Sequence, residues 1–209
     1  MSALQAADPP LVLASASAAR RAVLEAAGLC FEAMTAAVDE AALKESARAE
    51  GLTAGEAATL LAEAKARRAA GRRPDALVLG CDQILVLGEA RGEDWFDKPA
   101  DRDGARAHLA ALRGRTHALA TAVVAWRGGR RVWGHVATPR LTMRDASDAF
   151  LDAYLAAEGD AVLASVGAYR LEGPGAQLFT RIEGEHAAIL GLPLLALLEF
   201  LRGHGVLLR

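Results

Sequence analysis

The stretch LVLASASAARRAVL, residues 11–24, predicts a strand that leads directly into a helix. Its first four residues are apolar and predict a buried strand, and its last nine carry apolar residues at helical spacing. A strand that ends at serines and restarts as a helix leaves unpaired backbone N–H groups at the helix start. These donors suit a chain of phosphates together with the polar side chains of Ser15, Ser17, Arg20 and Arg21. An ordinary serine N-cap with two solvated arginines would have the same sequence, so the other motifs must decide.

Composition bounds the class of protein. The chain has 209 residues with 53% hydrophobic residues, enough for one sizeable core or for two lobes that share a cleft. A net charge of −2 argues against coating nucleic acid or an anionic membrane. No apolar run approaches the roughly 18 residues of a membrane span, and the N-terminal segment lacks the pattern of a signal peptide. Cys30 and Cys81 lack metal-ligand spacing and are expected to be reduced core thiols of a cytoplasmic protein.

The first half of the chain carries three further motifs. In ALVLGCDQILVL, residues 76–87, two apolar runs flank Asp82, which predicts an acid that is buried and paired or faces a cleft. Asp39-Glu40 follows a strand predicted over residues 31–35, and taken alone it is a solvated turn or an N-cap. Lys65 lies on an alanine-rich helix predicted over residues 53–70, which begins with a capping box and would ordinarily present a solvated basic face.

The second half adds Lys98, which Pro99 favours in an extended conformation, and a glycine-rich loop over residues 166–175. Glycines at that density permit turns and a close backbone approach to a ligand, although an ordinary loop would look similar. His117 taken alone is a structural hydrogen-bonding histidine. The final helix is apolar nearly all round, so we expect it to pack against the sheet or against a partner chain. Helices are predicted over residues 101–114, 147–157 and 194–201, and strands over 117–126, 131–138 and 177–182.

Taken in order, these motifs resemble the Maf family of nucleoside triphosphate pyrophosphatases, from residue 11 to about residue 202. The shared motifs are Ser15-x-Ser17-x-x-Arg20, Asp39-Glu40, Lys65, Gly80-x-Asp82, Lys98-Pro99, Gly114-Arg115-Thr116-His117, Gly167-Ala168-Tyr169 and Gly191-Leu192-Pro193. The resemblance implies an α/β fold with an elongated mixed β-sheet, flanking helices and two lobes around a cleft. It also implies a single domain over residues 11–209, preceded by an N-terminal tail of ten residues.

The resemblance implies an activity as well, the hydrolysis of a nucleotide between its α- and β-phosphates with the help of Mg²⁺ or Mn²⁺. Asp82 matches the catalytic acid, which either holds the metal or activates the attacking water, and Glu40 matches a second carboxylate at the metal. Lys98 matches a catalytic, phosphate-contacting lysine. The remaining phosphate contacts fall on Ser15, Ser17, Arg20, Arg21 and Lys65. Positive charge at these positions suits a transition state that spreads negative charge over phosphoryl oxygens.

Three positions bear on the choice of base. Gln83 and Glu172 match the subgroup that resembles 7-methylguanosine triphosphate pyrophosphatase. At the same two positions, the type that hydrolyses dTTP and UTP tends to have threonine and glutamine, respectively. A carboxylate offers only acceptors, which fit the N1–H and N2–H₂ donors of guanine, and methylation at N7 makes the base cationic. Ala19 departs from the arginine or tryptophan often found in the family, and Glu172 on a solvated loop would select nothing.

Other functions are weighed against this interpretation. A Rossmann dinucleotide binder and a P-loop NTPase are disfavoured, because neither glycine fingerprint is present. The alternatives that stay open are a dTTP/UTP pyrophosphatase of the same family and a non-catalytic regulator of septum formation. The expected partner is a nucleotide substrate, with neither nucleic acid nor membrane. The resemblance and the apolar last helix also predict a homodimer.

Overall fold

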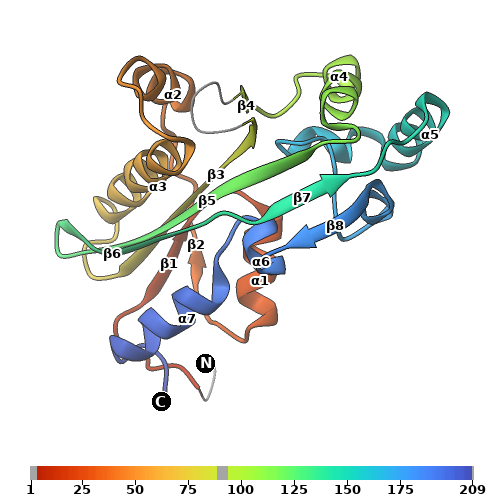
Figure 1. Cartoon of the computed structure of the whole chain (residues 1–209). Helices are drawn as coiled ribbons and strands as arrows, with labels where there is room; N and C mark the ends of the chain where they lie inside the picture. Colours follow the sequence, from red (N-terminus) through yellow and green to blue (C-terminus); the bar gives the residue numbers. More distant parts are fainter. Residues whose placement is uncertain (1–3, 89–93, 209) are drawn as a thin grey trace. The chain divides into compact units, whose positions relative to one another are not determined.

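A computed structural model of the chain describes residues 4–88 and 94–208 (Figure 1). The strands are β1 (Leu11–Ala14), β2 (Glu32–Ala33), β3 (Leu77–Leu87), β4 (Asp94–Phe96), β5 (Thr116–Arg127), β6 (Arg130–Ala137), β7 (Arg140–Met143) and β8 (Phe179–Glu183). The helices are α1 (Ala18–Ala26), α2 (Glu40–Ala49), α3 (Ala54–Ala70), α4 (Arg102–Leu112), α5 (Asp148–Glu158), α6 (His186–Ile189) and α7 (Leu194–Gly203). Two 3₁₀ helices, η1 (Gly159–Ala164) and η2 (Pro174–Leu178), precede β8.

Within the described residues, the strands form one mixed sheet in the order β2-β1-β3-β5-β7-β8, with β4 paired to β3 and β6 paired to β5. The pairs β1–β2 and β1–β3 are parallel, and β5 is antiparallel to both β6 and β7. The prediction of an α/β fold with a mixed sheet and flanking helices is therefore confirmed. No helix in the described parts of the chain is both long and apolar enough to cross a membrane.

The chain divides into two compact units. The first comprises Met1–Gln83, Thr121–Ala137 and Glu185–Arg209, and the second comprises Ile84–Ala120 and Thr138–Gly184. Strands β3 and β5 each contribute residues to both units. Residues 89–93 lie outside the described part of the chain. The polar composition of residues 88–96 predicts a loop, which is wrong for the strand β4, because those three residues pair with β3.

In the first unit, one face of the sheet is covered by α1 and α7. Successive side chains of a strand point to opposite faces, and the odd-numbered residues of β1 and of β3 as far as Cys81 turn toward this core. The buried residues of this core include Leu11, Leu13, Leu24, Leu77, Leu79, Cys81, Leu197 and Leu201. Trp133 of β6 stacks on Phe200 of α7 with ring centroids 4.6 Å apart. Figure 1 shows α3 over the opposite face of this part of the sheet.

Helix α3 lies against β3 because both surfaces are small. A Cβ at Gly80 would stand 2.1 Å from the carbonyl oxygen of Ala62 and 2.8 Å from the Cβ of Ala66. Only glycine permits this close approach. Asp82, two positions further along β3, points to the same face of the strand and therefore also meets α3. The helix begins with the predicted capping box, in which the Thr53 hydroxyl accepts from the Glu56 N–H and the Glu56 carboxylate accepts from the Thr53 N–H.

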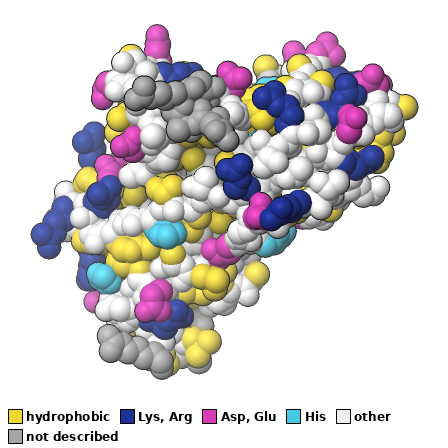
Figure 2. Space-filling model, viewed as in Figure 1, with side chains coloured by type: hydrophobic (Ala, Val, Ile, Leu, Met, Phe, Trp, Pro, Cys, Tyr) yellow, Lys and Arg dark blue, Asp and Glu magenta, His cyan; other side chains and the backbone are white. Residues whose placement is uncertain are grey.

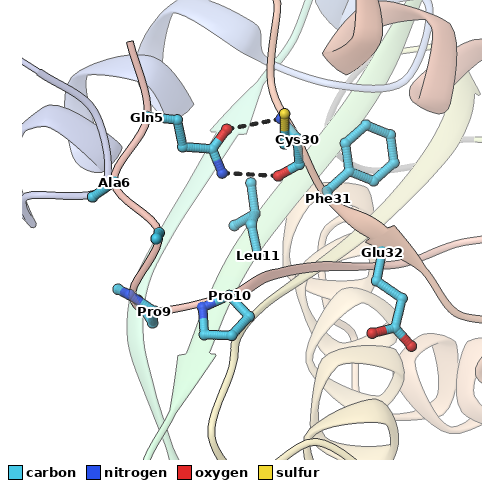
Figure 3. A pocket seen from close by; sticks show the side chains of 9 residues that line it. Gln5, Ala6, Pro9, Pro10, Leu11, Cys30, Phe31 and Glu32 are labelled. Carbon is cyan, nitrogen blue, oxygen red and sulfur yellow. Dashed lines mark hydrogen bonds between the residues drawn. The ribbon is translucent and has the colours of Figure 1, made fainter. Parts of the chain in front are cut away.

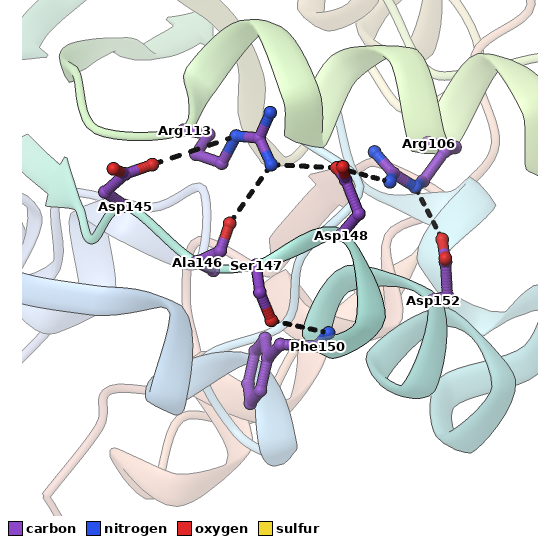
Figure 4. Close-up of polar contacts among 8 residues, drawn as sticks. All are labelled: Arg106, Arg113, Asp145, Ala146, Ser147, Asp148, Phe150 and Asp152. Carbon is purple, nitrogen blue, oxygen red and sulfur yellow. Dashed lines mark hydrogen bonds and ion pairs between the residues drawn. The ribbon is translucent and has the colours of Figure 1, made fainter.

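In the second unit, ion pairs join α4 to α5 and to the turn before it (Figure 4). Asp148 accepts from Arg106 and Arg113 at 2.8 Å each, and Asp152 accepts from Arg106 at 2.6 Å. Hydrogen bonds from the two arginines, Arg106 first, hold the pKa of Asp148 below its ordinary value. Because these carboxylates are exposed, we expect the network to orient the helices more than it stabilises the fold.

Two local expectations were wrong. The second strand, predicted over residues 31–35, is only two residues long, since it is an edge strand that among the described strands pairs with β1 alone. Cys30 is exposed, while Cys81 is buried as expected.

On the face displayed in Figure 2, basic and acidic side chains are interspersed, in keeping with the small net charge.

The segment before β1 pairs with the end of the chain. The Ala6 N–H donates to the Val206 carbonyl at 2.9 Å, and the Gln5 side chain bonds both backbone groups of Cys30 at 2.8 Å (Figure 3). A cavity of about 380 Å³ lies beside these residues. Among the described residues, it is lined by Gln5, Ala6, Ala7, Pro9, Pro10, Leu11, Cys30, Phe31 and Glu32. It therefore includes none of the residues that the sequence predicts for a nucleotide site.

Candidate active site

The centre of the candidate site is an ammonium group between two carboxylates in the first unit. Lys65 Nζ lies 2.5 Å from Asp82 Oδ1 and 2.8 Å from Glu40 Oε1. Lys65 and Asp82 are 8% and 5% exposed, whereas the side chain of Glu40 is 49% exposed. Asp82 is therefore buried and paired, one of the two arrangements that its flanking apolar runs predicted.

Local structure explains how these three side chains meet. Asp82 follows Gly80 on the same face of β3, and Lys65 lies one turn beyond Ala62 on α3, so the contact of helix and strand joins them. Glu40 is the first residue of α2, whose N-cap is Asp39. The Asp39 carboxylate accepts from the Ala42 N–H at 3.0 Å and fixes the start of that helix beside α3.

A second group of polar residues lies where β1 gives way to α1. Ser17 is the N-cap of α1, and its hydroxyl accepts from the Arg20 N–H at 3.3 Å. The Ser15 hydroxyl accepts from the Ser17 N–H at 3.2 Å and from Arg20 Nη1 at 3.3 Å. The serine cap that the sequence left open is therefore present, and it coexists with an arginine turned back toward the strand.

Arg20 joins three segments of the first unit. Its Nη1 donates to the Cys81 carbonyl at 3.0 Å and its Nε donates to the Gly191 carbonyl at 2.8 Å. Gly191 has φ +99°, and a Cβ there would lie 2.9 Å from the same Nε, so this contact requires glycine. Arg20 thus holds the start of α1 beside the residue that precedes Asp82, while Arg21 is exposed and Ala19 is half-buried.

The Cys81 thiol lies in the core on the opposite face from Asp82. Burial raises its pKa to about 11, although the cations of Arg20 and Lys65 oppose the shift. A thiol with a raised pKa stays neutral near pH 7, which argues against a nucleophilic role for Cys81.

Gln83 is anchored by its amide nitrogen. Nε2 donates to the Thr121 hydroxyl at 2.8 Å and to the carbonyls of Ala188 and Ile189 at 3.1 Å each. Carbonyls only accept, so they assign the nitrogen to this side of the amide and leave Oε1 as its acceptor. Thr121 is fully buried and donates to Ala188 at 3.0 Å. Sequence reasoning missed Thr121, whose only signal was a hydroxyl within an apolar strand.

In the second unit, Lys98 and Glu172 are exposed. Tyr154 anchors the loop that carries Glu172. The Tyr154 hydroxyl accepts from the Arg170 N–H at 3.3 Å and lies 3.4 Å from the Ala168 carbonyl, to which it donates. Arg170 also pairs with Glu158 at 3.2 Å, an ion pair that the sequence did not predict.

His117 and Tyr169 form a buried pair under the same loop, with His117 Nε2 and the Tyr169 hydroxyl 2.8 Å apart. Burial lowers the pKa of His117 to about 4 and raises the pKa of the Tyr169 hydroxyl. His117 is therefore neutral near pH 7, and its Nδ1 is buried without a hydrogen-bond partner among the described residues. This is the structural histidine that the sequence predicted when its motif was taken alone.

Few side chains at this site could ligate a divalent ion. In the described part of the chain, no three histidine, cysteine, aspartate or glutamate side chains gather into a ready-made cage. Glu40 and Asp82 nevertheless reach a common atom, and Mg²⁺ is commonly held by one or two carboxylates with water and substrate phosphates. The residues present fit an ion that arrives with a phosphate ligand.

Comparison with known proteins places the chain in a family. A model of the family described as Maf-like protein matches residues 10–204. A nucleoside triphosphate pyrophosphatase of Granulibacter bethesdensis is 57% identical over 197 residues, which cover 94% of this chain and 98% of that protein. A 7-methyl-GTP pyrophosphatase of Rhizobium meliloti is 49% identical over 199 residues, or 95% of this chain and 98% of that protein. One from Mesorhizobium japonicum is 50% identical over 197 residues, 94% of this chain and 97% of that protein. The chain belongs to the Maf family.

Proposed function

We propose that this protein hydrolyses nucleoside triphosphates between the α- and β-phosphates and releases a monophosphate and pyrophosphate. The observation that carries the proposal is the buried pair of Lys65 and Asp82 beside Glu40, next to a strand-to-helix turn with phosphate-binding chemistry. The names of the relatives, nucleoside triphosphate pyrophosphatase among them, support the same reaction class.

The residues divide the work of the reaction. Backbone N–H groups at the start of α1 and the exposed guanidinium of Arg21 bind phosphate oxygens, and the ammonium of Lys65 adds charge where it develops in the transition state. The carboxylate of Asp82 orients the attacking water and accepts its proton. Arg20 keeps the α1 turn in place through its bonds to Cys81 and Gly191. A divalent ion held by Glu40 and Asp82 would supply further positive charge to the phosphates. Lys98, in the second unit, stays the phosphate contact that its motif predicts.

We further propose that 7-methyl-GTP is the preferred substrate. Gln83 has its amide nitrogen committed to Thr121 and α6, so it offers a ligand an acceptor, as Glu172 does with its carboxylate. An acceptor at either position suits the donor-rich edge of guanine better than the mixed edge of uracil or thymine. A cationic base adds charge-assisted hydrogen bonds to the carboxylate, each of roughly 1.5–3 kcal/mol. Two relatives named 7-methyl-GTP pyrophosphatase are in keeping with this preference.

The experiment is a nucleotide panel assayed for pyrophosphate with Mg²⁺ or Mn²⁺ present. It compares 7-methyl-GTP with GTP, ATP, UTP and dTTP, and separates the products to distinguish a monophosphate from a diphosphate. We expect pyrophosphate from the panel and the highest kcat/KM for 7-methyl-GTP. A preference for UTP or dTTP would overturn the base assignment alone. Well-folded protein that releases no pyrophosphate from any nucleotide would favour a non-catalytic role, such as septum regulation.

A further inference from the structure

The ammonium of Lys65 occupies the point on which oxygens of Glu40 and Asp82 converge. One nitrogen atom contacts Glu40 at 2.8 Å and Asp82 at 2.5 Å, so the two carboxylate oxygens already converge on a common point. A magnesium ion would contact oxygens at about 2.0–2.1 Å. The ammonium and the ion therefore use the same oxygens and the same space.

Binding both cations at once would be costly. The two carboxylates carry two negative charges, which the ammonium reduces to a net charge of −1. A divalent ion beside that ammonium would meet strong repulsion in a poorly solvated place, because Lys65 and Asp82 are more than nine-tenths buried. The ion must displace the ammonium to reach both oxygens.

Displacement without a nucleotide also has a cost. An ammonium that leaves both carboxylates while it stays buried loses its counter-charges, and a buried charge without a partner is strongly unfavourable. A phosphate chain would remove this cost, since its oxygens can accept the hydrogen bonds that the carboxylates gave up. The ion and the nucleotide would therefore strengthen each other's binding through the position of one lysine.

We propose that Lys65 is an internal competitor of the divalent ion. In the nucleotide-free protein its ammonium holds Glu40 and Asp82, and the ion replaces it only when phosphate oxygens are present to receive the ammonium. This inference rests on the metal site of the proposed function, but it concerns the order of binding rather than the reaction.

The test measures Mn²⁺ binding without nucleotide, from the electron paramagnetic resonance signal of free Mn²⁺. Lys65→Met removes the competing ammonium and keeps the length of the side chain. We expect this variant to bind Mn²⁺ at least about ten-fold more tightly than the wild type, a coupling of ordinary size. Lys65→Gln, whose amide can donate to both carboxylates, is a second variant in case the methionine does not fold, and the same direction is expected.

Two controls isolate the cause. Arg68→Met removes the same charge from an exposed position on the same helix, and it should leave Mn²⁺ affinity within about two-fold, because exposed charges are well screened. Adding Asp82→Asn to Lys65→Met should abolish the gain, since the ion then loses one of its carboxylates. A gain that persists in this double variant would place the ion elsewhere and overturn the proposal.

The outcomes separate this inference from the proposed function. Unchanged Mn²⁺ affinity in folded Lys65→Met or Lys65→Gln would refute the competition, even if the wild type releases pyrophosphate. A tighter ion in these variants, together with a wild type inactive on every nucleotide, would leave the competition standing and reject the reaction.

Discussion

Lys65 Nζ and Asp82 Oδ1 lie 2.5 Å apart, and both residues are more than nine-tenths buried. The two residues are 17 positions apart in the sequence and come from different elements, a helix and a strand. A buried pair of this kind is worth little against an apolar replacement, but removal of one partner leaves a charge without compensation. The pair therefore fixes the position of two charges more than it stabilises the fold. The residues around it can be tested by substitution.

Gly80→Ala tests the approach of α3 to β3. The added methyl group would lie 2.1 Å from the Ala62 carbonyl, so the helix must shift and carry Lys65 with it. We expect a loss of about 1–3 kcal/mol in the free energy of unfolding, together with a loss of turnover. Urea denaturation and a kinetic assay measure the two effects. Gly203→Ala, where nothing lies within 4 Å of the new Cβ, is the control. Equal stability of the two variants would show that the close approach is not required.

Arg20 and Arg21 should differ, although both were predicted to bind phosphate. Arg20 donates to the Ser15 hydroxyl and to two carbonyls, so Arg20→Ala leaves buried acceptors without donors and should cost at least about 2 kcal/mol of unfolding free energy. Arg21→Ala removes an exposed side chain and should stay within about 0.5 kcal/mol of the wild type while raising KM. Thermal and urea denaturation of both variants provide the comparison. If Arg20 bound phosphate and had no structural role, Arg20→Ala would raise KM without the larger loss of unfolding free energy.

His117 should make stability depend on pH. Its pKa is lowered to about 4 in the folded protein, so the unfolded chain binds a proton that the folded chain excludes between the two pKa values. Stability should therefore fall as the pH drops from about 6.5 toward 4, by at most about 1.4 kcal/mol for each pH unit.

His117→Phe should remove this component of the pH dependence, whatever it does to stability at pH 7. Unfolding by urea at a series of pH values measures the slope. The exposed His135→Gln variant controls for the loss of an imidazole elsewhere in the chain. An unchanged slope in His117→Phe would mean that His117 binds its proton equally well in the folded and the unfolded chain.

Exchange of the base-selecting pair is the test of substrate preference. Gln83→Thr with Glu172→Gln should move the ratio of kcat/KM values toward UTP and dTTP. Threonine is too short to replace the donor at both α6 carbonyls, so a stability loss of about 1–2 kcal/mol should accompany Gln83→Thr. Glu172→Gln alone, on an exposed position, serves as the variant without that cost. A double variant that keeps the wild-type ranking of nucleotides would reject both residues as selectors.

Local features of the fold were predictable because they are written in short stretches of sequence. The strand at Leu11–Ala14 and the helix capped by Ser17 were confirmed, as was the capping box at Thr53. The edge strand at Glu32–Ala33 was predicted too long, since the length of an edge strand depends on its single neighbour rather than on its own residues.

The contacts of the site were less predictable. The helix pattern alone predicted that Lys65 would lie on a solvated basic face together with Arg67 and Arg68. In the structure the two arginines are exposed, but Lys65 is buried. Lys65 is buried because α3 meets β3 at Gly80, a tertiary contact that periodicity does not encode. The anchoring of Gln83 by Thr121 and the pairing of Arg170 with Glu158 likewise depend on segments that are distant in sequence.

The most direct test of the central claim is pyrophosphate release by Asp82→Asn, measured with saturating nucleotide and divalent ion. Asparagine keeps the size of the side chain but can neither carry the negative charge nor accept the proton of water. We predict a turnover at least about 10²-fold below that of the wild type, with the protein still folded by circular dichroism. Turnover near the wild-type value in folded Asp82→Asn would contradict the account.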